Sequence, residues 1–301
     1  MKLGVICDGI SRDLYHAVDV MDEFDLEYAE LQFVWDAEVG DHTPEQIKEM
    51  DSLLRDRGKP VSCLSRHIFA GMTQNNKPGD TLHTTHMDAL KRVIDMAHIL
   101  DAGLVRIMTP KKEQILWGSH GAEQWNVAKG AWDAILPLIA PAIELARAER
   151  VKLVVETGNG TMVNSSYTGR RLIDDLDAKD VLGVLWDPAN NCWCHEVAFP
   201  DGYMELSQGY LGHVHIKDVQ VDTPRAHLEV RRMDEGQLAP YFPKIASSLR
   251  QDGYQGVISF ESVYHKGDGD FEAGFRSCID RFMAHFLARI ISLLMPKSSQ
   301  I

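Results

Sequence analysis

The sequence has little that would anchor the chain in a membrane or direct it out of the cell. Its N-terminus, MKLGVICDGI, has only a short apolar run before Asp8, which is too brief for a signal peptide. The stretch FMAHFLARIISLLM is broken by His285 and Arg289 and is too short to span a bilayer. It predicts instead an amphipathic helical extension at about 283–301. We therefore expect a cytoplasmic protein.

Cysteine is also scarce. The five cysteines are an odd number spread over 301 residues, which is typical of reduced thiols rather than of a disulfide framework. Cys192, Cys194 and His195 lie close together, but a structural zinc site needs a second pair of ligands at a defined spacing, and none lies nearby. We interpret them as ordinary loop residues.

Basic residues are outnumbered. Lys and Arg total 31 against 44 Asp and Glu, which gives a formal net charge of -13. Nucleic acids and anionic membranes attract basic surfaces, so this balance argues against both as partners. An acidic enzyme can still bind a phosphate locally, so the balance leaves sugar phosphates open as substrates.

Eight short apolar segments alternate with longer amphipathic ones along the chain. They are rich in Val, Ile and Leu, as parallel strands buried on both faces are. The candidate strands are 2–7, 28–34, 60–65, 104–109, 151–157, 182–187, 211–218 and 256–262.

The segments between them carry helix signals. Thr43-Pro44-Glu45-Gln46 is a capping box with proline at the first helical position, and Gly58 follows as a stop. Apolar residues at helical spacing predict further helices over 80–100, 126–148, 239–250 and 271–291, with Pro137 and Pro141 expected to kink or divide the second of these.

Strands that alternate with helices predict a parallel α/β architecture, here a closed (β/α)8 TIM barrel with the whole chain, 1–301, in a single domain. An open, doubly wound sheet is the alternative. That fold usually opens with a glycine-rich phosphate loop, which the segment CDGISRD after the first strand lacks.

Metal-binding side chains end four consecutive strands. They are Glu156, Asp187, His215 and Glu261. Active sites of TIM barrels lie at the carboxyl ends of the strands, so these side chains should meet at one rim. Three carboxylates and an imidazole suit one divalent ion, with Mn²⁺ the best fit and Mg²⁺, Co²⁺ or Zn²⁺ able to replace it. The alternative is that they form ion pairs with Lys and Arg around the rim.

Other polar residues near this rim are candidates for substrate binding. His213 and Lys217 alternate with His215 along one strand and should face the barrel interior with it. His213 could instead support the metal ligand, and Lys217 could pair with Asp218 or another acid. Arg66 could bind a substrate anion or form a salt bridge at the rim.

The motifs ETGNGT, WDPANN, HVHIKD and SFES, with EG at 235–236 and GYQG at 253–256, resemble the xylose-isomerase-like TIM-barrel superfamily over nearly the whole chain. The superfamily includes ketose epimerases, hydroxypyruvate isomerase, and inosose and dehydroshikimate dehydratases. The resemblance implies a metal site at Glu156, Asp187, His215 and Glu261. It also implies that Glu156 and Glu261 move protons on opposite faces of the substrate.

Two positions depart from the ketose 3-epimerases that the chain resembles. Asn190 stands where those enzymes carry a histidine, and Val221 where they carry an arginine, and both of those residues handle substrate there. Asn190 remains a candidate substrate contact here.

The DNA-repair enzymes of the superfamily, of the endonuclease IV type, need further histidines that this chain lacks. Asp268 and Asp270 follow His265 and Lys266 and would repel a phosphate at the end of the last strand.

The sequence therefore predicts a metal-dependent isomerase or epimerase of a small sugar, ketose or keto-polyol, which works by proton transfer through a metal-stabilised enediolate. A metal-dependent dehydratase of the inosose or dehydroshikimate type is the first alternative, and a non-catalytic sugar-binding barrel is the second. Pairing of two copies through the outer helices stays open.

Overall fold

The computed structural model describes residues 1–112, 114–116, 125–127, 130–225 and 227–287. Helix α9 (Phe271–Phe286) is the last element in this part of the chain. Most of the C-terminal extension expected at about 283–301 lies outside the described residues, because these end at 287.

The eight predicted strands form one closed parallel barrel, which confirms the predicted fold class. The segments are apolar enough to be buried both toward the barrel axis and toward the helices, as parallel strands must be. In barrel order the strands are β1 (Lys2–Ile6), β14 (Val257–Phe260), β11 (Leu211–Ile216), β10 (Leu182–Trp186), β9 (Lys152–Glu156), β6 (Leu104–Ile107), β5 (Val61–Ile68) and β2 (Tyr28–Leu31).

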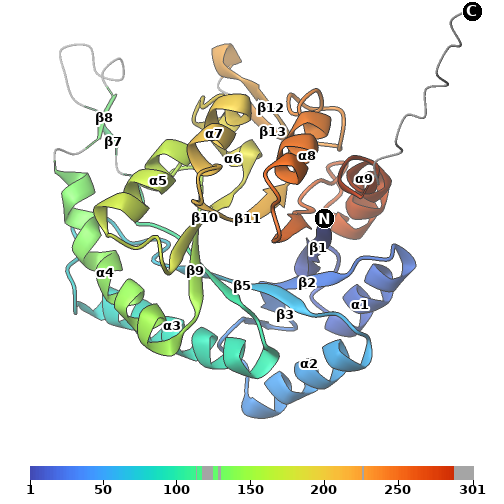
Figure 1. Cartoon of the computed structure of the whole chain (residues 1–301), viewed down its shortest axis with the longest axis horizontal. Helices are drawn as coiled ribbons and strands as arrows, with labels where there is room; N and C mark the ends of the chain where they lie inside the picture. Colours follow the sequence, from blue (N-terminus) through green and yellow to red (C-terminus); the bar gives the residue numbers. More distant parts are fainter. Residues whose placement is uncertain (113, 117–124, 128–129, 226, 288–301) are drawn as a thin grey trace, which may run out of the picture.

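Helices surround the strands in chain order (Figure 1). The larger ones are α1 (Leu14–Glu23), α2 (Pro44–Asp56), α3 (Thr81–Leu100), α4 (Ala131–Glu149), α5 (Ser166–Asp175), α8 (Phe242–Gln251) and α9. Shorter turns are η1 (Cys7–Gly9), α6 (Pro188–Trp193), η3 (Ala198–Gly202), α7 (Tyr203–Leu206) and η4 (Thr223–Arg225).

The predicted capping box begins α2, where the Thr43 side chain accepts from the backbone N–H of Gln46 and the Gln46 side chain accepts from that of Thr43. The helix predicted over 126–148 differs from the structure. It begins at Ala131, because Trp125–Val127 pairs with Gln114–Leu116 as strand β8 beside β7. Pro137 and Pro141 lie inside α4 without dividing it.

Short hairpins follow three of the barrel strands and extend beyond their carboxyl ends. They are β3 (Phe33–Val34) with β4 (Ala37–Glu38), β7 with β8, and β12 (Asp218–Asp222) with β13 (His227–Arg231). The Asp218 carboxylate accepts hydrogen bonds from the backbone N–H groups of Val219, Gly236 and Leu238, and so ties β12 to the segment after β13.

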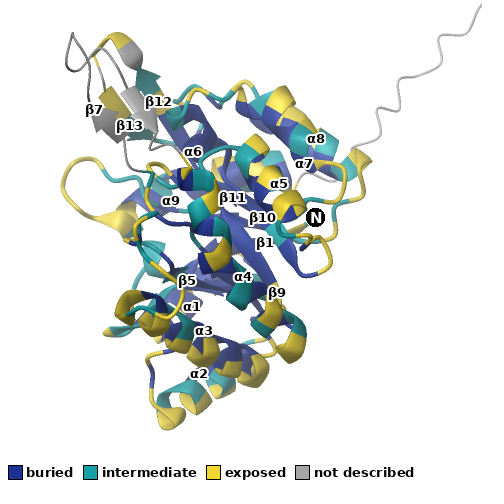
Figure 2. Ribbon diagram, turned by 90° about the vertical axis from the view of Figure 1, so that its left-hand side faces the viewer, coloured by how far each residue is buried: buried dark blue, intermediate teal, exposed yellow. Residues whose placement is uncertain are grey.

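The core lies between the barrel strands and the inner faces of the helices, as the burial colours of Figure 2 show. Around β14, for example, the ring of Phe260 lies 5.1 Å from that of Phe282 and 5.9 Å from that of Phe275, both from α9. None of the helices in the described residues is long and apolar enough to cross a membrane.

Helix α9 packs so closely on the preceding loop that Gly274 has no room for a side chain. A Cβ atom there would lie 1.8 Å from the carbonyl oxygen of Tyr264. We predict that Gly274→Ala lowers the free energy of unfolding by about 1–3 kcal/mol or more, since α9 must shift from the barrel. Urea unfolding measures this. Gly103→Ala, where a Cβ meets nothing within 4 Å, is the control, and equal stability of the two variants would contradict the packing described.

Candidate metal centre

Four side chains from neighbouring strands converge at the carboxyl end of the barrel. Glu156 ends β9, Asp187 follows β10, His215 lies near the end of β11, and Glu261 follows β14. Each offers one ligand atom, and these atoms all lie within 4.8 Å of one another. Glu156, Asp187 and His215 are buried, and Glu261 is partly exposed. The structure therefore brings together the whole set that the sequence analysis selected.

The orientation of His215 is set by a buried glutamate on β2. Glu30 Oε1 lies 2.8 Å from His215 Nε2, and Glu30 Oε2 lies 2.8 Å from His213 Nε2. With its Nε2 engaged, His215 turns Nδ1 toward Glu261 Oε2 and Glu156 Oε1, at 3.4 and 3.6 Å. Nδ1 is buried and has no hydrogen-bond partner among the described residues. Glu30 thus points the free imidazole nitrogen into the cluster.

Charges around Glu30 and His215 compensate for their burial. Burial alone raises the pKa of the Glu30 carboxyl, but the nearby imidazoles of His215 and His213 hold it well below its usual value. Burial lowers the pKa of His215, and the carboxylates of Glu30, Glu156 and Glu261 raise it well above its usual value. The imidazole therefore lies in a strongly negative environment.

Lys217 contributes a positive charge at the edge of the cluster. Its Nζ donates hydrogen bonds to Asp187 Oδ2 and, at 2.6 Å, to Glu261 Oε2. Burial raises the pKa of Asp187 to about 7, although Lys217 lowers it. Burial also raises the pKa of Glu261, but the opposing effects of Lys217 and His215 are larger together, so the pKa lies below its usual value. One ammonium thus serves two of the three carboxylates.

Glu156 is held from the other side by a buried arginine. Arg106 Nη1 on β6 donates to Glu156 Oε2 at 2.8 Å, and its Nη2 donates to the carbonyl oxygen of Ser65 at 3.1 Å. Asn190 Nδ2 lies 3.4 Å from Glu156 Oε1 and donates to the carbonyl oxygen of Thr157 at 2.7 Å. Burial raises the pKa of Glu156, and Arg106 and His215 bring it below its usual value.

The donor atoms fit a divalent cation. Glu156 Oε1 faces the cluster, the buried Nδ1 of His215 has no hydrogen-bond partner among the described residues, and carboxylate and imidazole ligands suit Mg²⁺, Mn²⁺ and Zn²⁺. Asp187 is the most constrained, because its Oδ1 also accepts from the backbone N–H groups of Ala189 and Asn190 at the start of α6. A cation here would share Asp187 and Glu261 with Lys217.

The other candidate residues differ in where they lie. Lys217 and Asn190 contact members of the cluster, and Lys217 pairs with Asp187 and Glu261 rather than with Asp218. His213 is fully buried against Glu30 and Ser259, and it is not a member of the four-residue cluster. Arg66 pairs with Asp41 at 2.6 Å and donates to the carbonyl oxygen of Val39, as a rim salt bridge would.

Glu30 and Arg106 were missed by the sequence reasoning. Both are charged residues inside strands that are otherwise apolar, YAEL and LVRI. Since charged side chains are almost never fully buried without a partner, a charge within such a strand is itself a signal of an interior ion pair. Their partners could not be identified from that signal alone.

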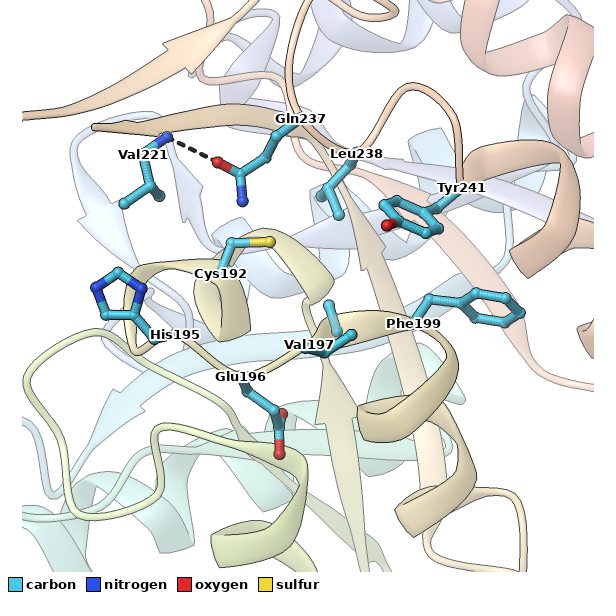
Figure 3. A pocket seen from close by; sticks show the side chains of 10 residues that line it. Cys192, His195, Glu196, Val197, Phe199, Val221, Gln237, Leu238 and Tyr241 are labelled. Carbon is cyan, nitrogen blue, oxygen red and sulfur yellow. Dashed lines mark hydrogen bonds between the residues drawn. The ribbon is translucent and has the colours of Figure 1, made fainter. Parts of the chain in front are cut away.

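A separate cavity of about 250 Å³ lies between the α6–η3 segment and the loop after β13 (Figure 3). Val221, at the position of the epimerase arginine, lines it with Leu238, Tyr241 and Phe199, and the Val221 N–H donates to Gln237 Oε1 at 2.8 Å. The lining therefore mixes these apolar side chains with the polar side chains of His195, Glu196 and Gln237. Cys192 and His195 line the same cavity, and the metal-binding groups found in the described residues include neither.

Comparisons with known proteins agree with the fold. A family model described as xylose isomerase-like TIM barrel matches residues 18–282. No curated protein matched the chain. Among solved structures, a xylose isomerase-like TIM barrel protein from Mycobacterium smegmatis in complex with magnesium is 18% identical, with a TM-score of 0.62 over 90% of this chain and 88% of that one.

Two further solved structures are enzymes by title. D-psicose 3-epimerase with D-tagatose, from Clostridium cellulolyticum H10, is 14% identical, with a TM-score of 0.65 over 93% of this chain and 92% of that one. The probable 3-DHS dehydratase of petrobactin synthesis from Bacillus anthracis is also 14% identical, with a TM-score of 0.68 over 92% and 98%. At these identities the likeness shows the fold.

We predict that Arg106→Met lowers the free energy of unfolding of chelator-treated protein by about 3–5 kcal/mol, because it leaves the buried Glu156 carboxylate without its cation. The double variant Arg106→Met/Glu156→Gln should recover much of this loss. Urea unfolding of the two single variants and the double variant measures the coupling.

The control is Arg92→Met, which removes an arginine paired with Asp41 at 2.6 Å but with a half-exposed side chain. Its effect should stay within about 1 kcal/mol. Additive single and double variants at Arg106 and Glu156 would show that the buried pair carries no coupling.

Proposed function

Because the chain belongs to the xylose isomerase-like TIM barrel family, we propose that it is a divalent-metal-dependent isomerase or epimerase of a small ketose or keto-polyol. The observation that carries the proposal is the convergence of Glu156, Asp187, His215 and Glu261 within 4.8 Å. The buried Nδ1 of His215 is directed into the group and has no hydrogen-bond partner in the described part of the chain. Carboxylates and an imidazole gathered in this way are both cation ligands and proton carriers.

The four converging side chains would hold the cation. Mn²⁺ is our first choice, and Mg²⁺, Co²⁺ and Zn²⁺ suit the same donors. When bound, such an ion acts as a Lewis acid toward a carbonyl oxygen and so acidifies the neighbouring C–H bond.

We assign Glu261 as the base that would take that proton. Lys217 binds its Oε2, and no described residue donates a hydrogen bond to its Oε1. Its side chain is 19% exposed, against 7% for Glu156, and it lines a cavity of about 250 Å³. Glu156 lies across the cluster with Oε1 facing inward, so it would exchange a proton with the other face of the substrate or with the next carbon.

Lys217 and Asn190 complete the set as polar groups that a substrate oxygen would meet. The ammonium of Lys217 would offset negative charge that develops on the substrate oxygens when a proton leaves. The amide of Asn190, already within 3.4 Å of Glu156 Oε1, would hold a hydroxyl beside that carboxylate. Lys217 has a third N–H to donate beyond those bound to Asp187 and Glu261, and the amide oxygen of Asn190 would accept from the hydroxyl.

The cellular setting follows from the thiols and the charge. All five cysteines are free, as in a reducing compartment. We place the protein in the cytoplasm, with a small carbohydrate as its ligand. Pairing of two copies through the outer helices is compatible with this function and is not needed for it.

We predict about one divalent ion per chain after purification without chelator. Glu156→Gln and His215→Ala should lose it or bind added Mn²⁺ much more weakly. Glu30→Gln should weaken Mn²⁺ binding by about 10–100-fold, because Glu30 orients His215 without touching the cation. Elemental analysis and calorimetric titration measure the stoichiometry and the affinity.

Glu38→Gln is the matched control, because Glu38 holds the His67 ring at 2.7 Å in a similar pair outside the cluster. It should bind Mn²⁺ like the parent. A parent protein without metal and without affinity for added Mn²⁺ would sink the proposed mechanism and favour a sugar-binding barrel.

With Mn²⁺ added, the protein should exchange a carbon-bound proton of its substrate with solvent deuterium. Glu261→Gln should slow that exchange by about 10²–10⁴-fold, since it removes the base. Proton NMR of a panel of ketoses and keto-polyols in D₂O detects the exchange, and mass spectrometry identifies the product. A product whose mass differs from that of the substrate only by the exchanged deuterium supports isomerisation or epimerisation, whereas loss of water would reassign the reaction to a dehydratase.

A further inference from the structure

A second cavity opens beside the candidate metal centre, over β1 and β2, which carry no member of the four-residue cluster, and over β14, which is followed by Glu261. It has a volume of about 250 Å³ and is lined by residues that follow β1, β2 and β14, together with Phe271 of α9. In the barrel, β14 lies between β11 and β1. Glu261 therefore belongs both to the cluster and to this cavity, and a substrate that reacts at Glu261 can extend into it.

Polar groups in this cavity have few partners within the protein. The hydroxyl of Ser262 is buried with no hydrogen-bond partner among the described residues. The Gln32 side chain lines the cavity, and no hydrogen bond from it to a described residue is present. Arg12 lies 4.8 Å from the ring of Phe33 and forms no ion pair with the described residues. An unpaired buried hydroxyl costs free energy unless a ligand or water completes it.

Asp8 supplies the complementary acceptor. Its Oδ1 accepts one long hydrogen bond, 3.4 Å, from the backbone N–H of Phe33. Burial raises the pKa of the Asp8 carboxyl despite opposing effects of that hydrogen bond and of Arg106 and Arg12. Gly9 brings this segment against the last strand, because a Cβ there would lie 2.7 Å from the Ser262 carbonyl oxygen. Asp8 and Ser262 thus share one wall.

We infer that this cavity, defined by Asp8, Arg12, Gln32 and Ser262, is a subsite for the uncharged, polyhydroxylated end of the substrate. The Asp8 carboxylate accepts hydrogen bonds from neighbouring hydroxyls. Arg12, Gln32 and Ser262 donate to the oxygens of the same hydroxyls. The inference rests on the proposed function, which places the reacting carbons at Glu261, and it selects a neutral ketose or keto-polyol as the substrate class.

The charges in the cavity argue against an anionic end. Asp8 and Glu261 both line it, and Arg12 is the one cationic side chain among its lining residues. A phosphate or carboxylate would therefore meet two carboxylates and one guanidinium. Vicinal hydroxyls use both kinds of group, since each hydroxyl donates one hydrogen bond and accepts others.

The test is calorimetric binding of D-fructose, D-fructose 6-phosphate and xylitol to the Mn²⁺-loaded protein. The variants are Asp8→Asn, Gln32→Ala and Arg12→Met. Two variants elsewhere on the rim are the controls. Asp36→Asn, at the exposed turn before β4, repeats the loss of negative charge in Asp8→Asn, and Lys266→Met, after β14, repeats the loss of positive charge in Arg12→Met. Affinity for Mn²⁺ is measured in every variant, so a damaged metal centre is recognised independently of sugar binding.

The parent should bind D-fructose and xylitol more tightly than D-fructose 6-phosphate. Asp8→Asn and Gln32→Ala should each weaken the two neutral ligands by about tenfold, with Mn²⁺ affinity and both rim controls unchanged. Tighter binding of the phosphate ester that depends on Arg12 overturns the subsite, as does unaltered binding in Asp8→Asn. A parent that binds Mn²⁺ but neither neutral ligand also overturns it.

If the parent binds no Mn²⁺, the proposed catalysis fails on its own. The same titrations without metal then still decide the subsite, through the dependence of D-fructose and xylitol binding on Asp8. Binding lost in Asp8→Asn supports it, and binding unchanged or absent overturns it.

Discussion

The burial of charge inside the barrel is the constraint on which the rest of the site depends. Glu30, Arg106, Glu156, Asp187, His215 and Lys217 all lie within the buried part of the molecule. A charge removed from water is tolerated only when an opposite charge or several hydrogen bonds replace the lost solvation. Each of these groups therefore has a specific partner, and the partners fix the directions of the side chains. The rim geometry results from these pairings as much as from the strands.

The barrel and the rim could be predicted because both depend on short-range patterns. Apolar runs of strand length alternate with capped helices, and the rule that sites lie at strand ends selected Glu156, Asp187, His215 and Glu261. Glu30 could not be connected to its partners, because His213 and His215 lie 183 and 185 positions away. The sequence predicted that α4 begins at residue 126, but it begins at Ala131. Trp125–Val127 instead pairs with β7 in a hairpin, and helical periodicity does not reveal such strand pairing.

The similarity to known barrels supports the architecture of this chain but does not by itself support a particular reaction. The family model and the solved structures show the architecture, while their low identity leaves the chemistry to the side chains of this chain. Here the mouth divides into two sectors that share Glu261. One, over β9, β10, β11 and β14, gathers cation ligands, and the other, over β14, β1 and β2, gathers hydrogen-bonding groups. Val221 and its neighbours in the cavity beyond α6 form a third region, of mixed polar and apolar lining, that belongs to neither.

The Asp187 carboxylate has two structural roles. One oxygen accepts from the first backbone N–H groups of α6, and the other binds Lys217. A related barrel without metal-dependent activity would still need this aspartate to start the helix, since loss of such a cap costs about 0.5–2 kcal/mol. The aspartate alone is therefore a poor marker of activity among related barrels. Under the proposed function, Glu261, which caps no helix in the described residues, is the position whose replacement would mark a relative without this activity.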